Sequence, residues 1–396
     1  MYLSEKFQSI SPSPTLAIDA KFKQMKADGL DVVGFGAGEP DFDTPRHIKD
    51  AAIEAINAGM TKYTPASGTM ELKQAVCDKL KADNGLDYQP NQIVISNGAK
   101  HSLMNAFGAI LNPGDEVIVP APFWVSYTEM IRLNDGIPVI VDTTEENGFK
   151  FTIDQLVSAI TPKTRAILIN SPSNPTGMLY TKEELQAVAD LAVEKNLYVI
   201  SDEIYEHLIY GGEKHVSIAS LGDKIKDLTI IINGVSKTYA MTGWRIGYTA
   251  SNAQIAKVMG SVQSHATSNP NSIAQRASYA ALTGPKDEIE EMRATFEERR
   301  CYMVERMNSI DGVSCLMPQG AFYVMMNISA LMGKTLYGTT ITDADVFANL
   351  FLEKAKVAVV PGTGFAAPNY VRWSYATSME NIKEGLDRLE RFLQEK

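Results

Sequence analysis

The sequence predicts an α/β fold with a mostly parallel central sheet, and three observations lead to that prediction. Short runs rich in β-branched and apolar residues recur through the middle of the chain, each with the length of a buried strand. Segments with helical patterns separate these runs. From about residue 287 the pattern changes, beginning with a long charged amphipathic segment. Strands that alternate with helices indicate a sheet covered on both faces, and the change indicates a smaller α+β domain.

The strand candidates of the larger domain are expected at 92–96, 115–120, 138–142, 166–170, 197–201, 228–232 and 246–251. Helices are expected at 99–111 and 181–196. The second of these starts with Thr181 and Glu184 at the spacing of a capping box. Ligands of such sheets bind at the carboxyl ends of the strands. The residues that follow each strand are therefore the first candidates for a site.

In the smaller domain, we expect a helix at 288–308, strands at 321–327, 357–361 and 370–375, and a closing helix at 379–396. The 396 residues exceed one ordinary core. We therefore divide the chain into an N-terminal segment at 1–45 that packs with the small domain, a large domain at 46–286 and a small domain at 287–396.

Composition argues against several classes of function. With 37 basic and 47 acidic residues, the net charge of −10 disfavours nucleic acid or an anionic membrane as a partner. The three cysteines are scattered and the five histidines lack metal-ligand spacing, so we expect free thiols and no metal site. The N-terminus lacks the apolar core of a signal peptide, and no apolar run approaches the length of a membrane span. We expect a cytoplasmic protein.

Glycine-rich turns occur at two candidate ligand positions. The stretch GFGAGEPDF at 34–42 contains closely spaced glycines, but Glu39 and Pro40 follow where a dinucleotide site would open a helix, so we exclude a nicotinamide cofactor there. This stretch is either a plain turn or a turn that offers the N–H of Gly38 to a ligand. The NGAK turn at 97–100 precedes a helix, whose start can bind an anion, although most such turns bind nothing.

Polar residues also follow two further strands. The proline-rich loop at 170–177 can hold one side chain rigidly, here Asn174, and a cis bond before Pro175 is compatible with its sequence. Asp202 ends the next strand, with Tyr205 close behind. Taken alone, the loop can be only a turn, Asp202 a helix cap and Tyr205 a packing aromatic.

The stretch NGVSKTYAMTGWRIGY at 233–248 contains two cations among small and apolar residues. Lys237, between Ser236 and Thr238, is a candidate for a Schiff-base lysine, because a desolvated amine loses its charge readily. Arg245 suits a phosphate, since its planar guanidinium forms paired hydrogen bonds to oxyanions. A surface lysine is the simpler explanation of Lys237 by itself. All these groups together suit one ligand, an aromatic aldehyde with a ring nitrogen, a phenolic oxygen and a phosphate.

The sequence resembles the fold-type I pyridoxal-phosphate aminotransferases of class I, in particular the bacterial aspartate aminotransferase-like subgroup. The most specific element is GVSKTYAMTGWRIG at 234–247. Further motifs follow in the family's order: AGEPDFDTP (37–45), KYTPASG (62–68), APFWVSY (121–127), NPTG (174–177), SDEIYEHL (201–208), GAFYV (320–324) and VVPGTGF (359–365). The likeness runs from about residue 10 to the C-terminus. It implies that the large domain binds pyridoxal 5′-phosphate.

The resemblance also implies roles for individual residues. Lys237 would form the Schiff base and later move the substrate's α proton, and Asp202 would pair with the pyridine nitrogen. Tyr205 and Asn174 would bind the phenolic oxygen, and Trp124 would stack on the ring. The phosphate and its surroundings would involve Gly98, Ala99, Lys100, Ser236, Arg245 and Tyr63 of a second subunit. The substrate's α-carboxylate would meet Arg372, with contacts from Gly38, Asn174 and Trp124.

Substrate preference would depend on the groups that face the substrate's side chain. In the subgroup, positions matching Lys100, Ser13 and Thr15 serve an acidic side chain, although the two hydroxyls can equally cap a helix that begins near Leu16. The expected reaction is ping-pong transfer of the amino group of L-aspartate to 2-oxoglutarate. The alternative is the same chemistry on prephenate or aromatic amino acids. A non-catalytic regulator is disfavoured by the charge. The resemblance implies a homodimer with shared active sites.

Overall fold

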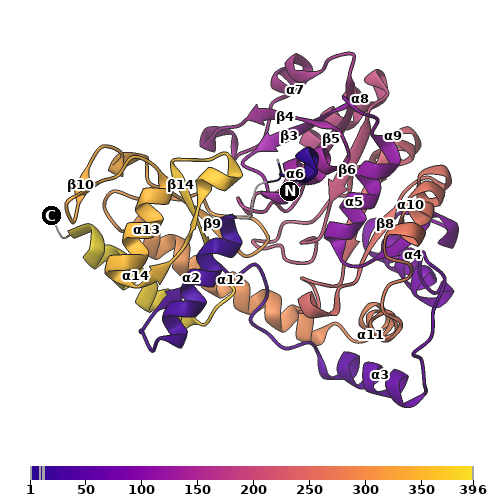
Figure 1. Ribbon diagram of the computed structural model, residues 1–396, viewed down its shortest axis with the longest axis horizontal. Helices are drawn as coiled ribbons and strands as arrows, with labels where there is room; N and C mark the ends of the chain where they lie inside the picture. Colours follow the sequence, from indigo (N-terminus) through magenta and orange to yellow (C-terminus); the bar gives the residue numbers. More distant parts are fainter. Residues whose placement is uncertain (1, 9, 11–13, 395–396) are drawn as a thin grey trace.

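The computed structural model describes residues 2–8, 10 and 14–394, and its centre is a seven-stranded sheet (Figure 1). The strand order is β2-β8-β7-β6-β5-β3-β4, and β8 alone runs antiparallel to its neighbours. The strands are β2 (Ile93–Ser96), β3 (Glu116–Ala121), β4 (Ile137–Asp142), β5 (Thr164–Asn170), β6 (Tyr198–Asp202), β7 (Thr229–Gly234) and β8 (Gly247–Ala250). The expected α/β class and mostly parallel sheet are confirmed.

Helices cover both faces of this sheet because its strands are apolar on both sides. In β5, Ala166 and Leu168 join one core, while Ile167 and Ile169 join the core on the opposite face. The first core lies under α5 (Ala99–Ile110), α6 (Ser126–Leu133) and α10 (Ala253–Ala266), and the second under α7 (Ile153–Ala159), α8 (Lys182–Lys195) and α9 (Asp223–Leu228). The capping box predicted at Thr181 and Glu184 is present.

Three further helices of the large domain pack around β2 and β8, and the sequence analysis did not anticipate them. They are α3 (Arg46–Asn57), α4 (Met70–Asn84) and α11 (Ser272–Thr283). Short 3-10 helices lie at Pro90–Gln92, Glu145–Asn147, Ile218–Leu221, Thr242–Trp244, Ser329–Leu331 and Gly362–Phe365. Among the helices of residues 2–8, 10 and 14–394, none is both long and apolar enough to cross a bilayer.

The smaller body contains an antiparallel sheet in the order β13-β14-β9, formed by β9 (Tyr323–Asn327), β13 (Val360–Pro361) and β14 (Tyr370–Ser374). Its helices are α12 (Asp287–Asn308), α13 (Ala344–Ala355) and α14 (Met379–Gln394), and a hairpin joins β10 (Thr335–Leu336) to β11 (Thr339–Thr340). The strand expected at 357–361 is two short strands, because β12 (Val357–Ala358) pairs with β1 (Val33–Gly34) whereas β13 pairs with β14.

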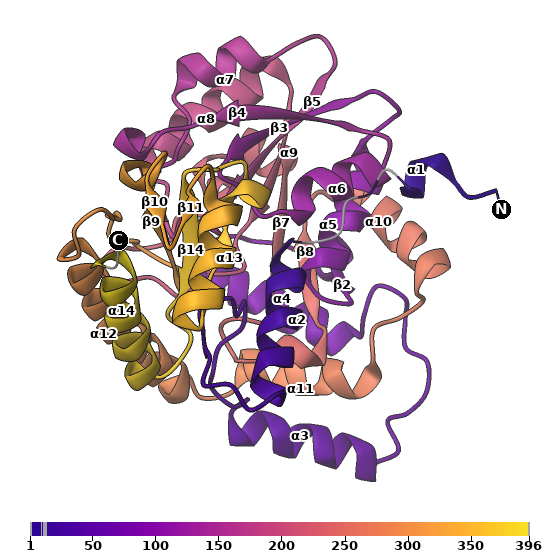
Figure 2. The same ribbon diagram turned by 60° about the vertical axis from the view of Figure 1, so that its left-hand side comes forward.

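The N-terminal segment comprises α1 (Glu5–Gln8), α2 (Pro14–Ala27) and β1. Ile18 of α2 packs with Leu352 of α13 and Ala358, and Figure 2 shows α2 beside α13. These contacts attach the segment to the smaller body. The division of the chain at 1–45, 46–286 and 287–396 stays a prediction.

Candidate active site

A cavity of about 600 Å³ opens at the carboxyl ends of the parallel strands, on the side where the smaller body packs. Its volume lies in the range of small-molecule sites. The predicted site residues that line it are Gly38, Ala99, Lys100, Trp124, Asn174, Asp202, Tyr205, Ser236, Lys237, Arg245 and Arg372. The chain thus brings residues from position 38 to position 372 into one space.

Lys237 lies in the loop after β7, and its amine Nζ donates a hydrogen bond to the carbonyl of Gly38. Burial lowers the pKa of this amine to about 8, against the opposing influence of Glu39, while Arg245 and Arg372 lower it further. With a pKa of about 8, a substantial minority of the amine is neutral near physiological pH. Neutral amines attack aldehydes, so Lys237 has the chemistry expected of a Schiff-base lysine.

The reactivity of this amine gives a testable pH dependence. We expect the apoprotein to capture pyridoxal phosphate faster as pH rises, with half of the maximal rate near pH 8, because only the unprotonated amine attacks the aldehyde. Stopped-flow absorbance at a series of pH values measures this rate, with Lys237→Ala as the blank. A capture rate that does not change between about pH 7 and pH 9 would contradict the assignment.

Asp202 ends β6 as a buried carboxylate that faces the cavity. The hydroxyl of Tyr127 donates to its Oδ2 at 2.7 Å, and the N–H of Ile204 donates to its Oδ1 at 3.3 Å. Burial raises the pKa of Asp202 to about 6, although both hydrogen bonds favour the charged form. No α-helix starts at this point of the chain, so the helix-cap alternative is wrong. A cationic ring nitrogen placed beside this carboxylate would compensate its buried charge.

Arg372 lies on β14 and is buried. Its Nη1 donates to Oδ1 of Asn174 at 2.9 Å and its Nη2 to the carbonyl of Gly36 at 3.2 Å. Its Nε has no hydrogen-bond partner within the described part of the chain. Burial lowers the pKa of this guanidinium. A buried cation with a donor to spare is suited to a carboxylate ligand.

An anion-binding turn lies at the start of α5. Gly98, with φ of +86°, precedes the helix, and the guanidinium of Arg245 lies directly against it. Arg245 is itself held by the carbonyl of Thr242, to which its Nη1 donates at 2.9 Å. A helix N-terminus and a fixed guanidinium together form a cradle for a phosphate.

A methyl group at Gly98 is expected to destroy this cradle. In Gly98→Ala, the new Cβ would overlap the guanidinium of Arg245, and φ of +86° is unfavourable for alanine. We expect cofactor affinity, measured by equilibrium dialysis, to fall at least about tenfold. Gly114→Ala is the matched control, because Gly114 has φ of +87° with no atom near its Cβ position. Equal affinities in the two variants would refute the cradle.

A family model described as aminotransferase class I and II matches residues 30–389. The chain belongs to this family. The aminotransferase uses pyridoxal phosphate, as the sequence predicted, and acts on amino acids and oxo acids. The residues present fit this cofactor, because a buried lysine amine, a buried carboxylate and a helix start beside a guanidinium surround one cavity.

Three relatives indicate how close the match is. The aspartate aminotransferase of Bacillus sp. strain YM-2 is 50% identical over 391 residues, 99% of each chain. The aspartate/prephenate aminotransferase of Nitrosomonas europaea is 47% identical over 392 residues, 98% of this chain and 99% of the relative. A solved structure of Thermus thermophilus aspartate aminotransferase with maleate has 44% identity and a TM-score of 0.94, and it covers 99% of this chain and 100% of that one. The fold type I prediction is confirmed.

Some predicted residues of the aminotransferase lie elsewhere or outside the description. Tyr63 does not line the cavity, and 91% of its surface is exposed. Ser13 is outside the described residues, and Thr15 is placed only as backbone in α2. Lys100 does reach the cavity mouth, where its Nζ lies 4.8 Å from the ring centroid of Trp124. Burial and, to a smaller extent, Arg245 lower the pKa of Lys100.

The sequence analysis missed three residues that contact the predicted ones. Tyr127 bonds to Asp202, and Tyr323 bonds to Tyr205. The guanidinium carbon of Arg372 lies 5.2 Å from the ring centroid of Phe365. Each of the three stands inside a family motif quoted above, so the signal was present. The motifs do not show which of their residues contact each other, because those contacts form only in the folded chain.

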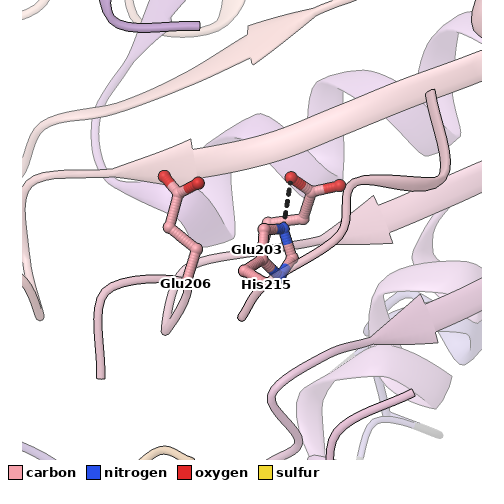
Figure 3. A group of neighbouring side chains, drawn as sticks. All are labelled: Glu203, Glu206 and His215. Atoms are coloured by element: carbon pink, nitrogen blue, oxygen red, sulfur yellow. Dashed lines mark hydrogen bonds and ion pairs between the residues drawn. The ribbon is translucent and has the colours of Figure 1, made fainter. Parts of the chain in front are cut away.

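One group outside the cavity has the composition of a metal site. Glu203, Glu206 and His215 lie together (Figure 3), with one possible ligand atom of each within 4.8 Å of the others. Both carboxylates already accept several hydrogen bonds, whereas Nδ1 of His215 has no partner among the described residues. Glu203 accepts from Ser201, Ser217 and His215, and Glu206 accepts from Lys79, Asn84 and Asn233. These contacts describe a compensated polar network, which needs no cation.

Proposed function

We propose that this aminotransferase transfers the amino group of L-aspartate to 2-oxoglutarate, giving oxaloacetate and L-glutamate in a ping-pong sequence. The observation that carries the proposal is the arrangement of cations around one cavity. Lys237 and Arg245 are assigned to the cofactor and Arg372 to an α-carboxylate. Two other cations, Lys23 and Lys100, also line the cavity, and the family resemblance assigns Lys100 to a second carboxylate. The substrate is then a dicarboxylate. The names of the Bacillus and Thermus relatives and the maleate in the latter support this choice.

Different residues of the chain have different roles in the proposed reaction. Pyridoxal phosphate, when bound, supplies an aldehyde for the amino group and a sink for the electrons of the Cα–H bond. Arg372 and Asn174 hold the α-carboxylate, which fixes the amino acid in the cavity. The freed amine of Lys237 would take the proton from the α-carbon as a general base and, as a general acid, deliver it to the carbon of the former aldehyde group. Asp202 holds a proton at the ring nitrogen.

The assignment of Lys100 predicts a loss of substrate preference. In Lys100→Ala, we expect kcat/KM for L-aspartate to fall about 10- to 100-fold, because a charged hydrogen bond to the distal carboxylate disappears. The value for L-phenylalanine should change less than about threefold. Steady-state assays with both donors measure the ratio, and Lys100→Arg, which keeps the charge, is the control. Equal losses for both donors would remove Lys100 from side-chain recognition.

A second candidate is the same chemistry with prephenate as the acceptor, which the printed name of the Nitrosomonas relative favours. Enzyme first converted to its amino form with L-aspartate separates the two. Reaction of this form with prephenate at a rate comparable to that with 2-oxoglutarate supports dual activity. Reaction with 2-oxoglutarate and not with prephenate supports the first proposal and excludes prephenate as an acceptor.

We also propose a homodimer with shared active sites, in a reducing cytoplasm. Apolar side chains are exposed around Tyr63 in the sequence: Ile53 and Ile56 of α3 are 51% and 54% exposed, and Met60 and Met70 are also exposed. Exposed apolar side chains are a feature of interfaces. The three cysteines, which form no disulfide, fit a reducing compartment. Sedimentation at micromolar concentration tests the dimer, and a monomer with full activity would overturn it.

A further inference from the structure

Tyr323 connects two parts of the active site that the sequence analysis treated separately. It lies on β9, is only 1% exposed, and lines the cavity. Its hydroxyl is 3.0 Å from that of Tyr205, the residue assigned to the cofactor's phenolic oxygen. Its ring centroid is 4.3 Å from the guanidinium carbon of Arg372, the residue assigned to the substrate carboxylate.

The sheet register explains this placement. Arg372 on β14 pairs across the antiparallel ladder with Met325 on β9. Tyr323 stands two residues before Met325 and therefore points to the same face of the sheet, as a diagonal neighbour of Arg372. Phe365 contacts the guanidinium as well, at 5.2 Å. The guanidinium is thus fixed by aromatic rings as well as by its hydrogen bonds.

The direction of the hydrogen bond between the two tyrosines follows from the assigned role of Tyr205. A phenol has one proton to donate. If Tyr205 donates that proton to the cofactor's phenolic oxygen, the bond between the tyrosines requires Tyr323 as the donor. Burial raises the pKa of both Tyr205 and Tyr323, so both hydroxyls keep their protons. A phenol that accepts a hydrogen bond is a stronger donor to its own acceptor.

We propose that Tyr323 is a positioning residue with two separable effects, its hydroxyl acting on the cofactor through Tyr205 and its ring acting on the substrate carboxylate through Arg372. The inference rests on the proposed function, because the roles of Tyr205 and Arg372 come from it. The charged groups around the pair of tyrosines are Lys237, Asp202 and Arg372. None of them is altered by a substitution at Tyr323.

Two substitutions separate the effects. Tyr323→Phe removes the hydroxyl and keeps the ring, so the phenolic oxygen of the cofactor is stabilised less in its charged form. We expect the pH midpoint of the bound cofactor's absorption to rise by about 0.5 to 1 unit. Maleate, a dicarboxylate without an amino group, should bind within about twofold of its wild-type affinity. Tyr323→Leu removes ring and hydroxyl, so the midpoint should rise similarly and the affinity for maleate should fall roughly three- to tenfold.

Tyr370→Phe is the matched control, because Tyr370 lies on the same sheet and its hydroxyl bonds to Glu145, away from the cavity residues. An unchanged midpoint in Tyr323→Phe overturns the inference, and so does a midpoint that shifts equally in Tyr370→Phe. If the Tyr323→Leu variant fails to fold, the pH midpoint of Tyr323→Phe by itself still tests the inference. Failure of the proposed function looks different, since wild-type enzyme would then not respond to L-aspartate at all.

Discussion

Replacing Lys237 with alanine is expected to reduce turnover by about 10⁴-fold or more, because one side chain both anchors the cofactor and carries the α proton. The fold should survive, since within the described residues the amine makes a single hydrogen bond, to the carbonyl of Gly38. Steady-state assays with L-aspartate and 2-oxoglutarate measure the loss, and thermal unfolding checks the fold. Lys150→Ala is a suitable control, because Lys150 pairs with Glu184 and does not line the active-site cavity.

Two results would contradict this account of Lys237. Wild-type rates in Lys237→Ala would show that another group carries the proton. A loss of activity that accompanied unfolding would leave the catalytic role without support. Partial rescue of a folded variant by an added small amine would favour the account, because the amine replaces the missing base.

Removal of the Asp202 carboxylate is the second large effect that we expect. In Asp202→Ala, abstraction of the α proton should slow by roughly 10²- to 10³-fold, because no anion then keeps the ring nitrogen protonated. The same expectation holds for Asp202→Asn, which keeps an oxygen acceptor for the hydroxyl of Tyr127. The two variants therefore share the lost charge and differ in the hydrogen bond.

Rapid mixing with L-aspartate deuterated at the α-carbon isolates this step. A larger isotope effect than in wild type is expected, since proton abstraction becomes more strongly rate-limiting. If the variants only bound cofactor more weakly, with the proton step unchanged at saturating pyridoxal phosphate, the role of Asp202 would be wrong. Asp115→Asn serves as the control, because Asp115 pairs with Arg165 outside the cavity.

Local pattern was enough to predict the large sheet and the strand ends that carry the site. The strands are short apolar runs buried on both faces, as in β5, and their carboxyl ends lie at one edge in a parallel sheet. Asp202 and Asn174 could therefore be proposed as neighbours although 28 residues separate them. The family motifs then identified Arg372, which no periodicity links to the large domain.

The sequence could not predict contacts between residues that lie far apart in the chain. The bond between Tyr323 and Tyr205 joins β9 to the turn after β6 and depends on how the two bodies meet. The interruption at Val359 arises because β12 and β13 have different partner strands. In the proposed homodimer, the exposed Tyr63 would meet the second subunit, a contact that the pattern of one chain does not predict.

The most direct test of the central claim is the absorption spectrum of the purified protein, saturated with pyridoxal phosphate, before and after L-aspartate. L-phenylalanine is the parallel sample. The account predicts that low concentrations of L-aspartate convert the band of the bound cofactor to that of its amino form, and that L-phenylalanine requires much higher concentrations. A band that responds only to L-phenylalanine would contradict the proposed substrate. A protein that forms no band with pyridoxal phosphate would contradict the site itself.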